Sequence, residues 1–308
     1  MSSARFLAPL ACLACCFVAG PARATDPDRV EWSPDWRRMA PWEVAGSFGL
    51  VAADVGIQLL IPTPTKADFT GGILFDDWVR KEVKGQNHAT QRTAADVSNY
   101  FFKGGIFVPF VMDGYLGALS IHENTDVAAQ LFAMDIESFA VAGLFSVGAE
   151  KLVGRARPYV DGCGPNGEVP RDSRGRQLHT CNSGENQSFF SGHSSATATT
   201  AGLVCAAHQH LPLFGGGVAD LAPCVVMIGI SGATGVLRIM ADDHWASDVV
   251  IGWSVGVFSG YVLPSLLHYG WGNRGHTPLG EVKSGSLVME PTLLPAEGGA
   301  EVGAVGTF

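Results

Sequence analysis

Six apolar segments, each about 20 residues long, dominate the pattern of hydrophobic and polar positions along this chain. No stretch of useful length alternates apolar and polar residues as a half-buried strand would, and no internal repeat is visible. Apolar segments of this length are typical of helices. The sequence therefore predicts an all-α fold, a helical bundle of about six core helices over 42–61, 101–121, 127–149, 193–211, 217–236 and 247–268.

The polar segments between and beyond these helices divide the chain into four parts. We expect a signal peptide over 1–24, and an N-terminal helix followed by a long polar connection over 25–100. The helical core then covers 101–268, and a Gly/Pro-rich tail, expected to be loosely ordered, covers 269–308.

The N-terminus has the pattern of an export signal. A short basic start, MSSAR, precedes the apolar run FLAPLACLACCFVAG, and Ala22-Arg23-Ala24 fits the small-x-small rule for cleavage. We expect export to the periplasm and a mature chain that starts near Thr25. An uncleaved anchor is the alternative, although the apolar run is short for a membrane span.

The composition suits either a large buried core or contact with lipid, because 47% of the residues are apolar and only 16% are charged. Carboxylates such as Asp113 and Asp135 lie well inside the apolar segments, where a membrane would make them unfavourable. The Lys and Arg residues of the loops are also distributed against the positive-inside rule. We therefore expect an exported bundle that is soluble or membrane-associated. The net charge of −9 argues against a nucleic-acid partner.

Four cysteines remain once the signal segment is removed. Cys163 and Cys181 bracket a polar loop, and a disulfide between them in an oxidising compartment would stabilise the fold by about 3 kcal/mol. Cys205 and Cys224 lie in apolar runs and are interpreted as buried small hydrophobic residues. The chain has no CxxC pair, which argues against a zinc ion bound by cysteines.

Three polar clusters interrupt the apolar pattern, each at the end of a predicted helix. They are GRARP with Arg155 and Arg157, SFFSGHSS with Ser191, Gly192 and His193, and LRIMADDHWASDVVIG with Arg238, His244 and Asp248. Because successive helices of a bundle alternate in direction, we expect all three clusters at one end, where they would form the active site. Arginine forks match phosphate oxygens and stay charged. A helix that opens with Ser-Gly-His also offers free N–H groups to an anion, so the sequence predicts a phosphate site.

His244 and Asp248 are four residues apart, a spacing that places both on one face of a helix. A carboxylate bonded to one ring nitrogen fixes the tautomer and leaves the other nitrogen free as a nucleophile or base. His193 can then protonate the leaving oxygen.

These clusters resemble the three sequence blocks of the type 2 phosphatidic acid phosphatase superfamily, which includes bacterial non-specific acid phosphatases and vanadium haloperoxidases. The blocks read K-x6-R-P, P-S-G-H and S-R-x5-H-x3-D, and the resemblance covers roughly residues 100–268 in the same order and spacing. It implies an all-α core and hydrolysis of phosphate esters without a metal ion or other cofactor. It also casts His244 as the nucleophile that forms a phosphohistidine, Asp248 as its orienting partner, His193 as the general acid, and Arg157, Arg238, Ser191 and Gly192 as the phosphate-binding residues.

Two departures from the family pattern leave the charge of the site unchanged. Leu237 replaces the serine before the arginine of the third block, and we expect it to remove one hydrogen bond. Phe190 replaces the proline before Ser-Gly-His, which loosens the turn and adds an apolar wall.

The third departure changes the charge. Glu150 stands at the family's lysine position, seven residues before Arg157, and Lys151 follows one residue too late. One residue turns a helix by about 100°, so Lys151 is a candidate phosphate-binding residue with a different direction. The sequence leaves open whether Lys151 or Arg155 compensates for Glu150.

Two patterns resemble metal sites. Asp242 and Asp243 adjoin the histidine of the third cluster, but no further ligand set is visible. We interpret them as exposed loop residues or as partners of Arg238, and His208 and His210 as a solvated helix end. We therefore expect no metal site.

The leading hypothesis is an exported phosphohydrolase that acts on phosphate monoesters or diphosphates of small molecules or lipids. A vanadate-dependent haloperoxidase is the first alternative, because the same oxyanion cradle holds vanadate, which would then be the cofactor. A phosphate- or lipid-binding protein with impaired catalysis is the second alternative, and Glu150 motivates it.

Overall fold

The computed structural model describes residues 30–163 and 186–270, and the backbone of 288–296 and 299–307. The expected signal peptide and Cys181 therefore lie outside the described residues. The chain divides into two units, Met1–Pro278 and Leu279–Phe308, which are described separately.

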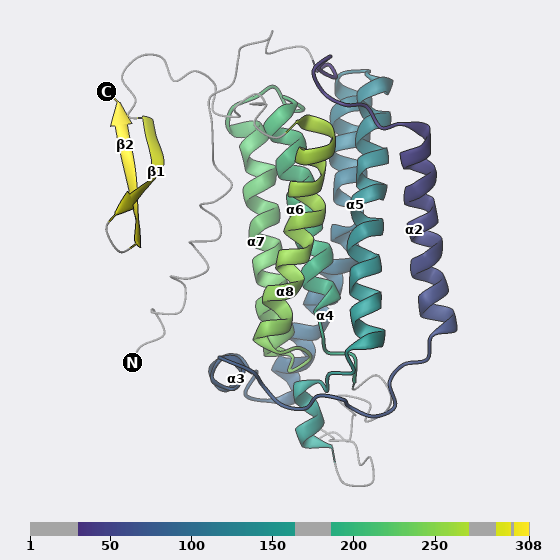
Figure 1. Ribbon diagram of the computed structural model, residues 1–308, viewed down its shortest axis with the longest axis vertical. Coiled ribbons are helices and arrows are strands. Elements are labelled where there is room, and N and C mark those ends of the chain that lie inside the picture. Colours follow the sequence, from purple (N-terminus) through teal and green to yellow (C-terminus); the bar gives the residue numbers. More distant parts are fainter. Residues whose placement is uncertain (1–29, 164–185, 271–287, 297–298, 308) are drawn as a thin grey trace. The chain divides into compact units, whose positions relative to one another are not determined.

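The first unit is a helical bundle, as the apolar pattern predicts (Figure 1). Its α-helices are α2 (Pro41–Leu60), α3 (Asp76–Val83), α4 (His88–Gly105), α5 (Thr125–Leu152), α6 (Gly192–His210), α7 (Val218–Met240) and α8 (Ala246–Val257). Short segments of other helical geometry are η2 (Pro109–Ile121), η3 (Pro158–Gly162), η5 (Phe258–Val262) and η6 (Ser265–Tyr269). In the second unit, β1 (Val288–Ala296) pairs with β2 (Gly299–Thr307) as an antiparallel hairpin. The glycine and proline pattern of the tail did not predict this hairpin.

The polar connection expected over 62–100 contains α3 and most of α4, so the second long helix begins earlier than its apolar residues indicate. Asn87 caps α4, and its side chain accepts a hydrogen bond from the N–H of Thr90 at 3.0 Å. The first turns of α4 carry Thr, Gln, Asp and Asn side chains, which the search for apolar segments passed over. The boundary expected at residue 100 therefore falls within a helix.

Helix α6 lies in the middle of the bundle, packed against α4, α5, α7 and α8 (Figure 1). Three glycines, Gly252, Gly256 and Gly260, allow α8 and η5 to approach α6 closely, because they lie four residues apart on one face. A Cβ atom at Gly252 would lie only 2.5 Å from the carbonyl oxygen of Ser191, and a Cβ atom at either of the others would meet the α6 backbone at a still shorter distance.

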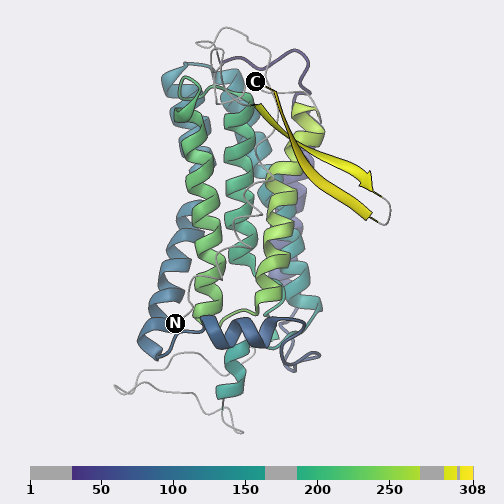
Figure 2. The same ribbon diagram turned by 90° about the vertical axis from the view of Figure 1, so that its left-hand side faces the viewer.

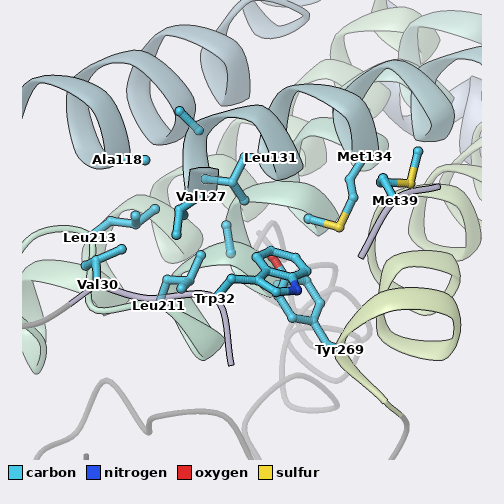
Figure 3. Packing of buried hydrophobic residues seen from close by; sticks show 13 residues of the cluster. Val30, Trp32, Met39, Ala118, Val127, Leu131, Met134, Leu211, Leu213 and Tyr269 are labelled. Carbon is cyan, nitrogen blue, oxygen red and sulfur yellow. The ribbon is translucent and has the colours of Figure 1, made fainter. Parts of the chain in front are cut away.

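A cluster of buried apolar side chains closes the end of the bundle at which α6 ends (Figure 3). The N-terminal segment before α2 contributes Trp32, whose ring centroid lies 5.6 Å from that of Tyr269. The labelled members of the cluster are Val30, Trp32, Met39, Ala118, Val127, Leu131, Met134, Leu211, Leu213 and Tyr269. This packing fixes one end of the bundle and leaves the polar clusters at the other.

His208 and His210 are buried rather than solvated, so the interpretation of this helix end was wrong. His208 lies between two carboxylates, with Nδ1 2.5 Å from Asp220 and Nε2 3.1 Å from Asp113. Burial lowers the pKa of His208, but these two hydrogen bonds outweigh it and raise the pKa to about 9. Over residues 30–163 and 186–270, no group of three or more His, Cys, Asp or Glu side chains is arranged to hold a metal ion.

Cys205 and Cys224 form a disulfide that joins α6 to α7, with Cα atoms 4.5 Å apart. Their interpretation as separate buried residues was wrong, because the two apolar runs face each other at this level of the bundle. Cys163 is also disulfide-bonded. Since Cys181 lies outside the described residues, its pairing with Cys163 stays a prediction.

The outer faces of the bundle carry many exposed apolar side chains. Leu59, Leu60 and Val218 are 79%, 82% and 72% exposed. Five helical stretches are long and apolar enough to cross a membrane, judged by length and composition only: Pro41–Leu60, His88–Ile121, Thr125–Leu152, Val218–Met240 and Ala246–Tyr269. This surface is compatible with membrane association.

Replacing Gly256 with alanine is expected to push α8 away from α6. We expect Gly256→Ala to lower the free energy of unfolding by about 1–3 kcal/mol, the usual range for overpacking. The matched control is Gly229→Ala in α7, where no atom lies within 4 Å of the new Cβ. This control should raise the stability by up to about 1 kcal/mol, because alanine favours the helix over glycine. Thermal unfolding followed by circular dichroism measures both, and equal shifts would contradict the close packing.

Candidate active site

Four helix ends meet at one end of the bundle. Helices α5 and α7 end there at Leu152 and Met240, whereas α6 and α8 begin there at Gly192 and Ala246. Helix α3 lies across the same end (Figure 2). The three polar clusters of the sequence are therefore neighbours, at the end opposite the apolar cluster around Leu211.

His244 is buried and lies two residues before α8. Its Nδ1 is 2.8 Å from the carbonyl oxygen of Ser188. A carbonyl oxygen only accepts hydrogen bonds, so Nδ1 carries the proton and Nε2 keeps its lone pair. Burial lowers the pKa of His244 well below its usual value, and the charges of Arg157 and Arg238 lower it further. His244 is therefore a neutral imidazole whose Nε2 has the electronic form of a nucleophile.

Asp248 contacts His244 less directly than the four-residue spacing predicts. The shortest approach is 3.9 Å, from Oδ2 to Nδ1, because His244 precedes α8 and is not on its helical face. The same Oδ2 instead accepts hydrogen bonds from the Ser188 hydroxyl at 2.6 Å and from the Trp245 N–H at 3.0 Å. Asp248 therefore orients His244 through Ser188, whose carbonyl binds the ring. Burial raises the pKa of Asp248 to about 6, although Arg155 favours its charged form.

Arg155, the other candidate to compensate for the missing lysine, is buried in a different network. Its guanidinium donates to Asp248 Oδ1 at 2.5 Å and to Asp76 Oδ2 at 2.7 Å. It is 1% exposed. Arg155 thus joins the connection that contains α3 to the first turn of α8.

Asp76 is the residue of this network that sequence reasoning missed. Besides Arg155, its carboxylate accepts hydrogen bonds from the Ser247 N–H at 2.7 Å, the Ser247 hydroxyl at 2.7 Å and the Ile73 N–H at 2.9 Å. Burial alone would raise the pKa of Asp76, but these hydrogen bonds outweigh burial and lower it. Its only signal in the sequence was a position in the first turn of a short polar helix.

Arg157 and Arg238 face each other across Asp243. Arg238 forms an ion pair with Asp243 at 2.9 Å, and Arg157 approaches the same carboxylate at 3.8 Å. Within the part of the chain that the structure describes, the Nε–H groups of both arginines are buried and have no hydrogen-bond partner. Arg238 is buried and Arg157 is partly buried. Two such cations with unused donors are suited to bind an anion with several oxygen atoms.

The two aspartates before His244 are both buried, so neither is an exposed loop residue. Asp243 is a partner of Arg238, as expected. Asp242 instead binds Arg80 at 2.6 Å and Lys84 at 2.6 Å, which ties α3 to the turn after α7.

His193, the second residue of α6, is held by two residues of α4. Its Nε2 lies 2.8 Å from Asn99 Oδ1, and its ring centroid lies 4.5 Å from that of Phe102. Burial lowers the pKa of His193 to about 2, and the charges of Arg238 and Arg157 contribute to the same shift. Asn99 was missed because it falls in the segment taken as a polar connection.

Ser191 and Gly192 shape the N-terminus of α6. The Ser191 hydroxyl accepts hydrogen bonds from the N–H and the hydroxyl of Ser194, at 3.4 and 2.9 Å, so it caps the helix. At Gly192, a Cβ atom would lie 2.8 Å from Ser146 Oγ and 3.4 Å from Glu150 Oε1. Glycine at this position lets α5 and α6 approach each other beside the arginines.

Lys151 points towards the connection between α2 and α3, where its Nζ donates to Thr63 Oγ1 at 3.3 Å. Arg155 is occupied by its two carboxylates. Of Glu150, Lys151 and Arg155, it is Glu150 whose side chain lies beside the first residue of α6. The structure thus places neither candidate cation where Glu150 lies.

Residues 136–271 match the family model of the PAP2 superfamily. This region runs from within α5 to the end of the helical core and contains all three polar clusters. No curated protein matches the chain.

The Arg155 network predicts a large effect for one aspartate and a small one for its neighbour. Asp76→Ala leaves a buried guanidinium with one of its two carboxylates, so we expect the free energy of unfolding to fall by about 3 kcal/mol. Asp77→Ala, which removes the exposed adjacent carboxylate, should change it by less than about 0.5 kcal/mol. Denaturant unfolding followed by tryptophan fluorescence measures both. A small effect of Asp76→Ala would show that the network does not hold α8 in place.

Proposed function

Because the chain belongs to the PAP2 superfamily through residues 136–271, we propose that it is a phosphohydrolase that cleaves phosphate monoesters or diphosphates. The proposed reaction passes through a phosphohistidine and needs no metal ion or other cofactor. The match to this superfamily implies hydrolysis of phosphate esters. The observation that carries the finer proposal is the pair of buried Nε–H groups of Arg157 and Arg238 near a neutral His244. Neither group has a hydrogen-bond partner among the described residues.

The phosphoryl group is proposed to bind between Arg157 and Arg238, with its oxygen atoms on their free donors. The N–H groups of Gly192 and His193, in the first turn of α6, add donors and the positive end of the helix dipole. The phosphate displaces Asp243 from at least part of its contact with the two guanidinium groups.

In the first step, Nε2 of His244 attacks phosphorus and the bond from phosphorus to the ester oxygen breaks. The proton stays on Nδ1 of His244 and remains hydrogen-bonded to the Ser188 carbonyl, while Asp248 holds Ser188 in position. The leaving oxygen takes a proton from His193. In the second step, water gives a proton to His193 and attacks phosphorus, which releases phosphate and restores His244.

His193 must bind a proton to act as the acid, although burial and its charged neighbours lower its pKa to about 2. The charges of Arg238 and Arg157 contribute to that low pKa. A phosphate dianion bound between these arginines offsets their charge and adds a favourable partner for the protonated ring. Substrate binding therefore raises the pKa of His193 and prepares the acid for the first step.

The proposed substrates are phosphorylated small molecules or lipids. The exposed apolar helices support association with a membrane, and the N-terminal segment supports export to the periplasm. A vanadate-dependent haloperoxidase has no further observation in its favour.

Removal of the nucleophile is expected to abolish turnover. His244→Ala should reduce phosphate release from an ester, assayed in EDTA, by at least about 10⁴-fold, because no other side chain in the cluster offers a free ring nitrogen in that place. The matched control is His122→Ala, because His122 lies after η2 and away from the cluster.

Activity that survives His244→Ala would contradict the phosphohistidine. Bromide oxidation that depends on added vanadate would favour the haloperoxidase, and tight phosphate binding without turnover by the unchanged protein would favour a binding protein.

The role of His193 can be tested with two leaving groups. For an alkyl phosphate, whose leaving oxygen needs a proton, His193→Ala should lower kcat by about 10²–10⁴-fold. For p-nitrophenyl phosphate, whose leaving group departs as an anion, the loss should be at least tenfold smaller. Equal losses for the two substrates would mean that His193 holds the phosphate rather than donating a proton.

A further inference from the structure

Glu150 lies in the last turn of α5, and its side chain reaches the proposed phosphate site. Its Oε1 lies 3.4 Å from the position that a Cβ atom would take at Gly192, the first residue of α6. The first turn of α6 is also where the free N–H groups point. Within the described part of the chain, the Glu150 carboxyl has no hydrogen-bond or ion-pair partner. It is therefore an uncommitted polar group at the edge of the site.

Charges from three directions act on this carboxyl. Arg157, which follows α5, and Arg238 of α7 attract its ionised form, and so does Lys151 on its own helix. Asp54 of α2 repels it. The first two of these charges are the ones proposed to bind phosphate, so an ionised Glu150 and a phosphate group depend on the same cations.

The two protonation states of Glu150 have opposite effects on a bound phosphate. The ionised carboxylate accepts hydrogen bonds only and repels a phosphate oxygen at short range. The neutral carboxyl has an O–H group that donates to such an oxygen. Burial raises the pKa of Glu150 to about 7, and the charges of Arg157 and Lys151 only partly oppose this shift. Both states are therefore populated around neutral pH.

We propose that neutral Glu150 binds the phosphoryl group as a hydrogen-bond donor, and that ionised Glu150 opposes its binding. This inference rests on the proposed function, because it places phosphate between Arg157 and Arg238. It makes the site selective for acid conditions through a residue of α5 rather than through either histidine. At the position where the resemblance expects a permanent cation, the chain has a donor that is lost as the pH rises.

The test compares kcat/KM of Glu150→Gln with that of the unchanged protein from pH 5 to pH 9. Glutamine donates a hydrogen bond at every pH, and the ratio of the two proteins cancels the titration of the substrate and of the histidines. The neutral fraction of Glu150 falls tenfold for each pH unit above 7. The ratio of variant to unchanged protein should therefore be near one at pH 5 and about tenfold at pH 8. Glu82→Gln, the same change at an exposed position of α3, should give a flat ratio.

A flat ratio for Glu150→Gln would overturn the inference while leaving the phosphohydrolase intact. Sulfate binding to the unchanged protein gives a second measurement that needs neither turnover nor a variant, because sulfate keeps its charge between pH 5 and 9. Its affinity, followed by calorimetry, should fall about tenfold per pH unit above pH 7. Affinity that is constant over this range would also overturn the inference. Absence of phosphate release by the unchanged protein at all pH values would instead contradict the proposed function alone.

Discussion

The buried guanidinium of Arg155 is the interaction on which the candidate site depends. It lies between Asp76 and Asp248, at 2.7 and 2.5 Å, and is almost completely removed from water. A buried ion pair stabilises a fold only when its partners are complete, because desolvation of the charges opposes their attraction. Here each carboxylate has further hydrogen bonds, although the Nε–H of Arg155 is buried without a partner among the described residues. The effect of the network is positional, since Asp248 holds Ser188, and Ser188 fixes the tautomer of His244.

A second constraint is the balance of charge around that network. Arg155 has two carboxylates, whereas Arg157 and Arg238 share Asp243. The histidines between them are kept neutral by burial and by these cations. The excess of positive charge is therefore local to Arg157 and Arg238, where two cations face one carboxylate. Water reaches this place poorly, which strengthens its attraction for an anion. Arg155 is thus occupied by its own two carboxylates, whereas Arg157 and Arg238 have only one carboxylate between them.

Much of this arrangement could be predicted from the sequence, because it follows from segment length and direction. The apolar runs located the six core helices, and alternation of direction brought Arg157, His193 and His244 to one end. Contacts that depend on the relative register of two helices were not accessible, and the Cys205–Cys224 disulfide is an example. The same holds for Asn99, which lies on a polar half of α4 that no apolar pattern marked.

Local geometry at helix ends was the other limit of prediction. The spacing of His244 and Asp248 suggested a shared helical face, but α8 starts at Ala246, after the histidine. The Asp248 carboxylate instead accepts hydrogen bonds from the Trp245 N–H, at the start of its own helix, and from the Ser188 hydroxyl. Ser191 likewise caps α6, where its type and place in the motif suggested a phosphate contact. At the start of a helix, the hydroxyl of a short polar residue can bond to a backbone N–H or to a ligand. A sequence motif does not show which of the two it does.

The glycine row of α8 and η5 has a consequence for how such a site can diversify. Gly252, Gly256 and Gly260 bring the backbone of α8 and η5 against that of α6. The distance between these helices, behind the two histidines, therefore cannot be adjusted by changing the size of a side chain. Any change in the space beside these histidines must come from neighbouring side chains, such as Phe102 of α4 and Glu150 of α5. Directed evolution of substrate range would therefore gain most from substitutions in α4 and α5, and least from substitutions in the contact between α6 and α8.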